Sequence, residues 1–124
     1  SSATLNSLAG LVFGDNVYIA YNTVLIGVSL HIQNDVIIGP NSLISGSDHV
    51  FDGDSFRRTA SRQSKVLIEK GSWVGGNCSI TSGSILPSQS ILAAGSVLTK
   101  KFTESKTIYG GIPAIKIKKI NEIN

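Results

Sequence analysis

The chain contains no Met, one Cys and three Pro, and only 6% of its 124 residues are aromatic. The single Cys78 excludes an intrachain disulfide and a zinc site built from several cysteines, so a reducing, cytoplasmic setting is expected. No apolar run approaches the ~20 residues that a membrane-spanning helix needs. The length allows one domain, residues 1–124, and the lack of any Met leads us to expect a trimmed N-terminus.

Charge is scarce as well, with 15% charged residues and a formal net charge of +3. Residues 98–124 hold six of the 11 Lys and Arg but only two of the eight Asp and Glu. Because the chain has one Trp and no interleaving of Arg with aromatic residues, a nucleic-acid surface that stacks on bases is not predicted. The local basic character instead indicates an anionic ligand near the C-terminal end.

What the sequence does have is a repeat of six residues. From Ile68 onward an aliphatic residue stands at every sixth position without a miss, and a small residue follows four positions after each of the first five. The aliphatic positions are Ile68, Val74, Ile80, Leu86, Leu92 and Leu98, and the small ones are Ser72, Cys78, Ser84, Ser90 and Ser96. The N-terminal half has the same spacing at Phe13, Ile19 and Leu25 and, after one extra residue, at Ile32, Ile38 and Ile44.

A period of six excludes an amphipathic helix, because about 100° per residue would point successive members in three different directions. In extended chain an even period keeps every member on one face, and Gly, Asn, Asp and Ser between the members favour turns. The pattern therefore predicts an all-β fold, a parallel β-helix in which three hexads make one coil. A β-sandwich of short strands is the alternative, but it would not keep so strict a spacing.

The repeat is interrupted in two places. Residues 49–66 are polar, charged and without the six-residue spacing, which predicts a loop extruded from the β-helix. From Lys100 the chain departs again, and we expect residues 100–124 to form a C-terminal tail that closes the end of the prism.

Several motifs then resemble one known family, the hexapeptide-repeat acyltransferases, in the branch of sugar and xenobiotic O-acetyltransferases. Residues 68–77 (IEKGSWVGGN) resemble its I-G-x-x-V-W-I-G coil, and residues 92–100 (LAAGSVLTK) resemble its I-G-A-G-S-V-V-T-K coil. Residues 111–116 (GIPAIK) are similar to its G-x-P-A-K exit, and Ser47-Asp48-His49 stands in the place of its catalytic histidine. Together these motifs span nearly the whole chain.

The resemblance implies a left-handed parallel β-helix, a homotrimer with active sites between subunits, and acetyl-CoA as the acyl donor. It implies an acetyl-CoA-dependent O-acetyltransferase acting on a saccharide hydroxyl by direct transfer, with polysaccharide biosynthesis as the expected setting. The identity of the acceptor, the choice between O- and N-acylation and the acyl chain length stay open.

His49 is the expected general base, because a neutral imidazole with a pKa near ~6.5 accepts a proton at physiological pH. Asp48 is the candidate to orient the ring or contact the acceptor, with Asp52 and Asp54 close in sequence. Asn22 stands roughly where related sugar acetyltransferases place an acceptor-contacting Asn, and a turn role explains it equally well. No motif matches His31, which we expect to be structural or exposed.

For the coenzyme, the resemblance implies that Trp73 forms a wall of the groove and that the backbone of Gly76 and Ala94 contacts the pantetheine amides. It also implies that three residues bind the adenosine phosphates, namely Thr99, Lys100 and Lys116. Cys78 is expected to be inert core. Three loop residues, Arg57, Arg58 and Arg62, are candidates to grip an anionic acceptor, with solubility as the plainer explanation.

Other functions fit less well. A β-helix carbonic anhydrase uses three histidines at zinc and this chain has two, so no metal is expected. A nucleotide-sugar pyrophosphorylase needs a separate nucleotide-binding domain, and an ice-binding solenoid would repeat one residue type along a flat face. A non-catalytic scaffold or partner subunit stays open as the alternative.

Overall fold

The computed structural model describes residues 4–5 and 10–122, which form a left-handed parallel β-helix with three flat faces. The six-residue period predicts the parallel β-helix, and the family resemblance implies its left hand. Face A contains β1 (Thr4–Leu5), β4 (Val24–Ile26), β7 (Leu43–Ser45), β12 (Ser79–Ile80) and β15 (Val97–Leu98). Face B contains β2 (Leu11–Phe13), β5 (Leu30–Ile32), β10 (Val66–Ile68) and β13 (Ile85–Leu86). Face C contains β3 (Tyr18–Ile19), β6 (Ile37–Ile38), β11 (Trp73–Val74), β14 (Ile91–Leu92), β16 (Thr107–Gly111) and β17 (Ala114–Lys119).

Strands of successive coils pair in parallel and bring the repeat positions into register. Ile68 pairs with Leu86 and Ile80 with Leu98, which sets one coil at three hexads. In the N-terminal half Leu25 pairs with Ile44, so that this coil is one residue longer than the later ones. The extra residue lies in the corner that joins β4 to β5. A local insertion at a corner therefore leaves the stacking of the core intact.

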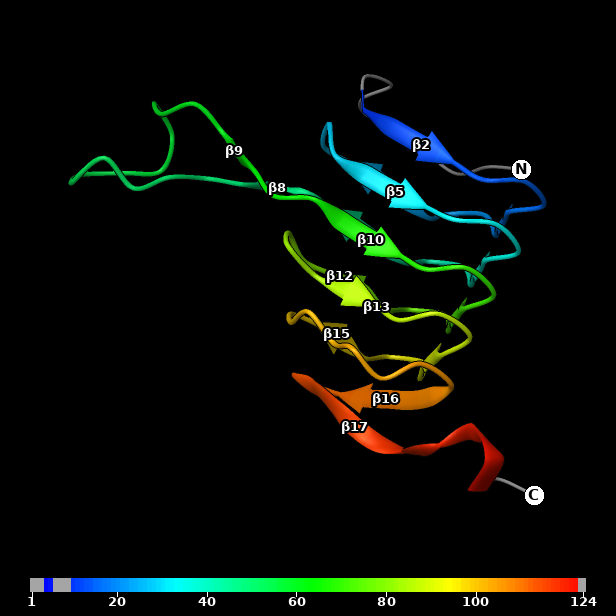
Figure 1. The fold of residues 1–124 in the computed structure, drawn as a ribbon. Coiled ribbons are helices and arrows are strands. Elements are labelled where there is room, and N and C mark those ends of the chain that lie inside the picture. Colours follow the sequence, from blue (N-terminus) through cyan, green and yellow to red (C-terminus); the bar gives the residue numbers. More distant parts are fainter. Residues whose placement is uncertain (1–3, 6–9, 123–124) are drawn as a thin grey trace.

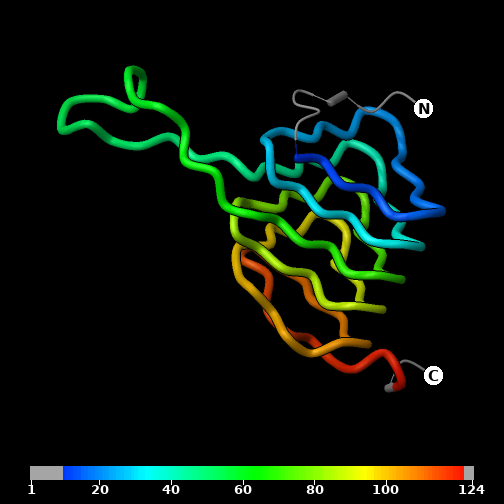
Figure 2. The backbone as a smooth tube through the Cα atoms, turned by 45° about the horizontal axis from the view of Figure 1, so that its top comes forward, coloured from blue at the N-terminus to red at the C-terminus, as the bar shows by residue number. Residues whose placement is uncertain are grey.

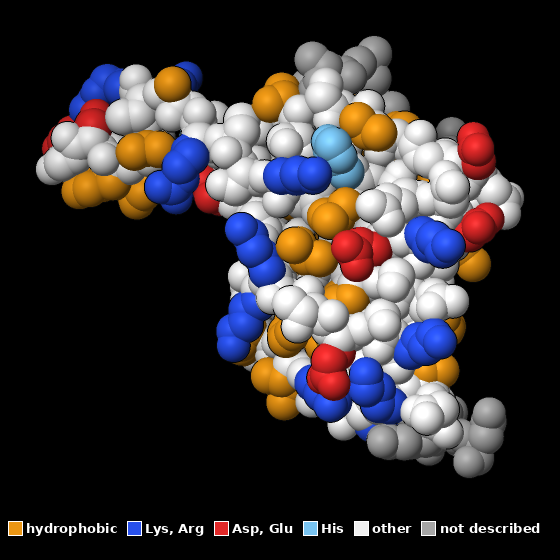
Figure 3. All heavy atoms as spheres, in the orientation of Figure 1, with side chains coloured by type: hydrophobic (Ala, Val, Ile, Leu, Met, Phe, Trp, Pro, Cys, Tyr) orange, Lys and Arg blue, Asp and Glu red, His pale blue; other side chains and the backbone are white. Residues whose placement is uncertain are grey.

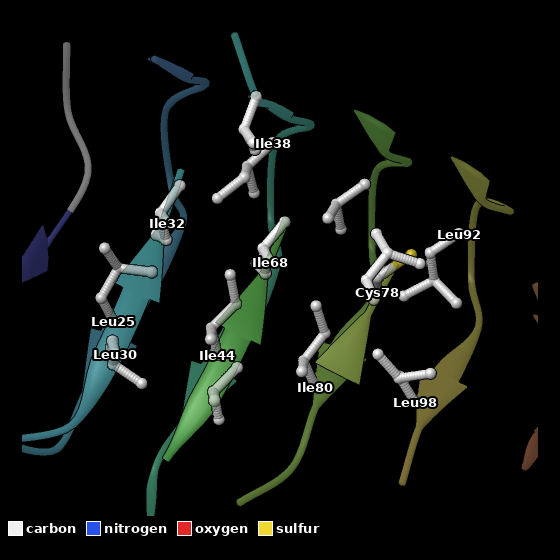
Figure 4. Close-up of a cluster of buried hydrophobic side chains, with 14 of the residues drawn as sticks. Leu25, Leu30, Ile32, Ile38, Ile44, Ile68, Cys78, Ile80, Leu92 and Leu98 are labelled. Atoms are coloured by element: carbon white, nitrogen blue, oxygen red, sulfur yellow. The ribbon is translucent and has the colours of Figure 1, made fainter. Parts of the chain in front are cut away.

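The repeat residues fill the interior of the prism (Figure 4). From Leu25 to Leu98 every aliphatic repeat position is no more than 1% exposed. The first two repeat positions are the exceptions, Phe13 at 41% exposed and Ile19 half-buried, because β2 and β3 lie at the edges of faces B and C.

The small residues four positions later are buried at the corners, where their side chains bond to corner carbonyls. The Ser72 hydroxyl donates to the carbonyl of Pro87 at 2.7 Å, and that of Ser84 donates to Leu98 at 3.1 Å. The Cys78 thiol, 1% exposed, lies 3.2 Å from the carbonyl oxygen of Ala93. An apolar side chain at these positions would leave a buried carbonyl without this donor.

Corners need residues that tolerate the left-handed conformation, and Asn, Asp and Gly supply most of them. At the corner from face C to face A (the CA corner) the positive φ values fall at Asn22, Asn41, Asn77 and Gly95. At the corner from face B to face C (the BC corner) they fall at Asn16, Asp35, Gly71, Gln89 and Lys106.

The extruded segment leaves at the corner from face A to face B (the AB corner), between β7 and β10 (Figures 1 and 2). Its base is an antiparallel ribbon of β8 (Ser47–Asp48) and β9 (Arg62–Gln63). The predicted limits of 49–66 are therefore shifted, because ordered pairing begins at Ser47 and Val66 already belongs to β10. We call residues 47–63 the extruded ribbon.

The C-terminal segment continues the β-helix further than expected. Lys101 bridges to Ile85, and β16 adds to face C beside β14. Only β17 turns back, antiparallel to β16, and a 3-10 turn (Ile120–Glu122) follows. Tyr109 of β16 is 1% exposed and its ring centroid lies 4.3 Å from that of Phe102, so this segment closes the end of the core.

Candidate active site

Most of the predicted site residues lie on two corners of the prism that border face A, whereas Trp73 and Lys116 lie on strands of face C. His49, Thr99 and Lys100 follow face A strands at the AB corner, whereas Asn22 precedes β4 at the CA corner. Within one chain His49 and Asn22 therefore lie beyond opposite ends of the face A strands. A site that uses both residues needs the CA corner of one copy of the chain to lie against the AB corner of another copy.

His49 is exposed and directly follows β8, at the base of the extruded ribbon. That base is held in place from several sides. The Gln63 side chain accepts a bond from the Val28 amide at 3.2 Å and donates to the Ser47 hydroxyl at 3.1 Å. The Ser64 amide donates to the Gly46 carbonyl at 2.9 Å, which continues the coil-to-coil bonding across the insertion. The histidine is thus presented on a fixed base.

Asp48 already has two partners. Its Oδ2 accepts a hydrogen bond from the Ser82 hydroxyl of the next coil at 2.5 Å and lies 3.7 Å from the Arg62 guanidinium on the facing strand. These contacts tie the ribbon to the prism. Asp48 directly precedes His49, and its partner Ser82 is a residue that the sequence did not single out.

The loop carboxylates and arginines also pair with each other. Arg58 contacts Asp54 at 2.7 Å and Asp52 at 3.9 Å. Asp52 accepts bonds from the backbone amides of Ser55 and Asp54, which lower the pKa of its carboxyl. With Arg62 bound to Asp48, two of the three candidate arginines are neutralised within the ribbon.

At the CA corner the backbone of successive coils stacks closely. A Cβ on Gly39 would lie 2.6 Å from the Gly76 amide nitrogen, and one on Gly75 would lie 2.7 Å from that of Ala94. Gly76 and Ala94 face outward from this stack, Gly76 half-buried and Ala94 exposed. Small side chains leave the corner backbone open to a ligand that approaches closely, as the pantetheine assignment requires.

Asn22 has φ of 60° at the same corner, and Asn41 and Asn77 stack beneath it with nearly the same conformation. The turn therefore explains an Asn at this position. Its side chain is exposed, so a ligand contact is compatible with the turn role.

Trp73 lies on the outer surface of face C, 51% exposed. It belongs to a row of apolar side chains that runs along the prism through paired positions of neighbouring strands, namely Tyr18, Ile37, Trp73 and Ile91. This position, three residues before Gly76, fits a wall beside the CA corner.

The three predicted phosphate partners do not lie together. Thr99 and Lys100 are exposed at the AB corner after β15. Lys116 lies on β17, where its Nζ contacts Glu104 Oε2 at 2.9 Å. The hydrogen bond from Lys116 is the main cause that lowers the pKa of the Glu104 carboxyl. Within one chain Lys116 is therefore an end-cap residue, apart from Thr99 and Lys100.

Two further expectations concern single residues. Burial is the main cause that raises the pKa of the Cys78 thiol, which suits an inert core position. His31 is half-buried on face B beside Val12 and Leu67 of the neighbouring strands, away from the ribbon.

Among residues 4–5 and 10–122, no three His, Cys, Asp or Glu side chains group as metal ligands, and no helix is long and apolar enough to cross a membrane.

The chain is similar in sequence to galactoside O-acetyltransferases. It is 30% identical over 111 residues to that of Lactococcus lactis subsp. lactis, which covers 89% of this chain and 53% of the relative. It is 26% identical over 110 residues to that of Escherichia coli K12, which covers 88% of this chain and 54% of the relative. The chain thus spans about half the length of these curated relatives. No model of a protein family matches it.

Solved structures show the same fold. A hexapeptide-repeat acetyltransferase from Vibrio cholerae, complexed with acetyl coenzyme A, superposes with a TM-score of 0.86 at 26% identity over 94% of this chain and 64% of that one. A maltose O-acetyltransferase from Clostridium difficile 630 gives a TM-score of 0.86 at 27% identity over 95% of this chain and 63% of that one.

Proposed function

Because the chain belongs to the hexapeptide-repeat acyltransferase family, we propose that it acts as an acetyl-CoA-dependent O-acetyltransferase on a saccharide hydroxyl. The observation that carries this proposal is an exposed histidine, His49, at the fixed base of a ribbon extruded from the β-helix. The sugar acetyltransferases among its relatives support the acceptor class. Because acetyl-CoA is the proposed donor, we infer a cytoplasmic setting.

The chemistry follows from the imidazole of His49. In its neutral form the ring takes the proton of the acceptor hydroxyl while the oxygen attacks the thioester carbonyl. The C–S bond of the tetrahedral intermediate then breaks, and the imidazolium returns its proton to the leaving thiolate of coenzyme A. Asp48, bonded to Ser82 and Arg62, fixes the backbone that carries the ring. No covalent acyl-enzyme is needed.

The donor fits the prism along the CA corner. Gly76 and Ala94 expose backbone without long side chains, and Trp73 stands beside them as a wall. We assign the phosphates to Thr99 and Lys100 at the AB corner. Lys116, engaged by Glu104, reaches them only from another copy of the chain.

That division of the site between two corners supports an oligomer, and we propose the homotrimer of the family resemblance. The AB corner of one copy would face the CA corner of the next, which would bring His49 towards the neighbour's copy of Asn22. Because each such contact joins two different surfaces of the chain, the copies can close into a ring, and each interface of that ring holds one complete site.

The test is coenzyme A release from acetyl-CoA with neutral, anionic and amino sugars as acceptors, measured for the parent and for His49→Ala. We expect kcat/KM to fall by about 10²- to 10⁴-fold, the usual contribution of a general base, with the Kd of acetyl-CoA unchanged. His31→Ala is the matched control and should retain activity.

Mixing two variants, His49→Ala and Asn22→Gly, each of which we expect to be inactive alone, tests the shared site. Asn22→Gly removes the amide but keeps a residue that tolerates φ of 60°. If the site lies between subunits, refolding His49→Ala with Asn22→Gly should recover about a quarter of parental activity, because one interface in four then carries both intact residues. Full activity of His49→Ala would refute the histidine base. Failure of the parent to bind acetyl-CoA would favour the scaffold alternative.

A further inference from the structure

We propose that a hollow on face B, beside the base of the extruded ribbon, binds the phosphate group of a phosphorylated saccharide acceptor. This inference rests on the proposed function and names the class of acceptor. The hollow has a volume of about 380 Å³ and lies between β10 and β13 at the AB corner. Its lining residues are Ser64, Lys65, Leu67, Gly83, Ile85 and Lys101.

The first argument is the charge of the hollow. Lys65 and Lys101 are both exposed, and neither forms an ion pair with any residue in the described part of the chain. The lining contains no carboxylate. The ribbon arginines differ, since Arg58 and Arg62 are each neutralised by aspartates. Lys65 and Lys101 are therefore open to an anionic ligand and are the cations that line the hollow, and Figure 3 shows basic side chains along the edge of the prism just below the ribbon.

The second argument is the spacing of the lysines. Lys101 bridges to Ile85, and Ile85 pairs with Leu67, so these three share one row across face B. Lys65 stands two residues before Leu67 and hence on the same side of the strand. Two strand spacings and two residues separate the lysine backbones by about 12 Å. Two long flexible side chains that start this far apart can converge on one phosphate between them.

The third argument is the shape of the floor. Leu67 and Ile85 are half-buried and apolar, and Gly83 contributes no side chain, with nothing closer than 3.7 Å to where a Cβ would stand. The Gly83 amide donates to the Ser64 carbonyl at 3.1 Å, which keeps this part of the corner regular. An apolar floor with a cationic rim suits a ligand that has a C–H face and a charged end, as a sugar phosphate does.

The fourth argument is the position relative to His49. Asp48 pairs with Arg62, so His49 stands opposite residue 61 of the ribbon, four residues before Lys65. Four extended residues span about 13 Å, which a lysine side chain and a phosphorylated sugar cover together. Because Asp48, Gln63 and Ser64 fix the ribbon base to the prism, this separation is set by the fold.

Phosphate binding is measured first without turnover, by NMR titration of the full chain with inorganic phosphate and with glucose 1-phosphate. The test variant is Lys65→Gln/Lys101→Gln. The control is Lys70→Gln/Lys118→Gln, which removes the same charge from exposed positions outside the hollow. We expect the Kd for both ligands to rise about tenfold or more in the test variant only, with unchanged melting temperatures.

Kinetics then separate the acceptor from the coenzyme. In the test variant KM for glucose 1-phosphate should rise about tenfold, while KM for glucose and the Kd of acetyl-CoA stay at parental values. Equal phosphate affinity in the test and control variants would overturn the proposal. A loss of affinity for acetyl-CoA but not for 3′-dephospho-acetyl-CoA would overturn it too, because the lysines would then hold the coenzyme phosphate. Phosphate binding without any acetyl transfer would instead refute the proposed function and leave the anion site standing.

Discussion

Two adjacent glycines at the CA corner have different surroundings although their sequence context is alike. A Cβ on Gly75 would lie 2.7 Å from the Ala94 amide nitrogen, whereas one on Gly76 would meet nothing closer than 3.4 Å. Neither has a positive φ, so backbone strain does not separate them. Gly75 is therefore required by the stacking of coils, whereas the position of Gly76 has room for a Cβ.

We predict that Gly75→Ala destabilises the protein by about 1–3 kcal/mol, the usual cost of overpacking, and that Gly76→Ala changes the free energy of unfolding by less than about 0.5 kcal/mol. Urea denaturation measures both. In Gly76→Ala the added methyl group should raise KM for acetyl-CoA if the pantetheine crosses this corner. An equal loss of stability in the two variants would contradict the stacking argument.

Single residues also show how far the sequence could predict the site. The six-residue period located the buried ladder from Leu25 to Leu98, because side-chain direction in a β-helix follows directly from spacing. It could not show that Asp48 is bonded to Ser82, since that contact crosses 34 residues. Nor could it separate Lys116 from Lys100, because the pairing of Lys116 with Glu104 depends on how the last strand turns back.

The C-terminal strands close the core with an aromatic pair, and this element has its own pH dependence. The Tyr109 hydroxyl donates to the Glu104 carbonyl at 2.6 Å, and burial is the main cause that raises its pKa above the usual 10. A raised folded-state pKa means that the unfolded chain loses its proton first as the pH rises. The stabilising contribution is therefore complete below about pH 10 and is lost as the pH passes through the raised value.

Tyr109→Phe should cost about 0.5–1.5 kcal/mol near neutral pH, the net value of one hydrogen bond. Its stability should fall less than that of the parent between pH 9 and 11, because the buried ionisable group is gone. Urea unfolding followed by circular dichroism at several pH values gives both numbers. Tyr18→Phe is the control, since Tyr18 is 61% exposed. A parallel loss of stability above pH 9 in parent and Tyr109→Phe would contradict this account.

Other elements departed from their predicted limits for a common reason. The tail from Lys100 lost the six-residue pattern, yet β16 still pairs with β14 because backbone hydrogen bonds, unlike core packing, do not need aliphatic repeats. The extruded ribbon began earlier than 49 because antiparallel pairing extends from the prism into the insertion. Hydropathy spacing marks where side chains enter the core, and it does not mark where strands end.

At the scale of the whole molecule, the β-helix that forms the core and the extruded ribbon that carries His49 are separate parts of the structure. The prism is a stack in which each coil contacts its neighbours, and the extruded ribbon interrupts one corner without shifting the register of face A or face B. The corner from β4 to β5 makes the same connection with three residues, Gly27-Val28-Ser29, where the ribbon-bearing corner uses residues 46–65. The shorter connection shows that the prism does not require the insertion.

We therefore predict that replacing residues 46–65 by Gly-Val-Ser gives a folded β-helix without acetyltransferase activity. Shortening a loop from 20 to 3 residues lowers its closure cost by about 1.7 kcal/mol, which offsets the lost bonds of Asp48 and Gln63 to the prism. The melting temperature should stay within a few degrees of the parent, whereas Ile68→Ala, a mid-stack cavity, should lower stability by about 2–5 kcal/mol. Calorimetry and the coenzyme A release assay test the two halves of the prediction separately. If the shortened chain fails to fold, the ribbon is part of the folding unit; if it folds and retains turnover, His49 is not the base.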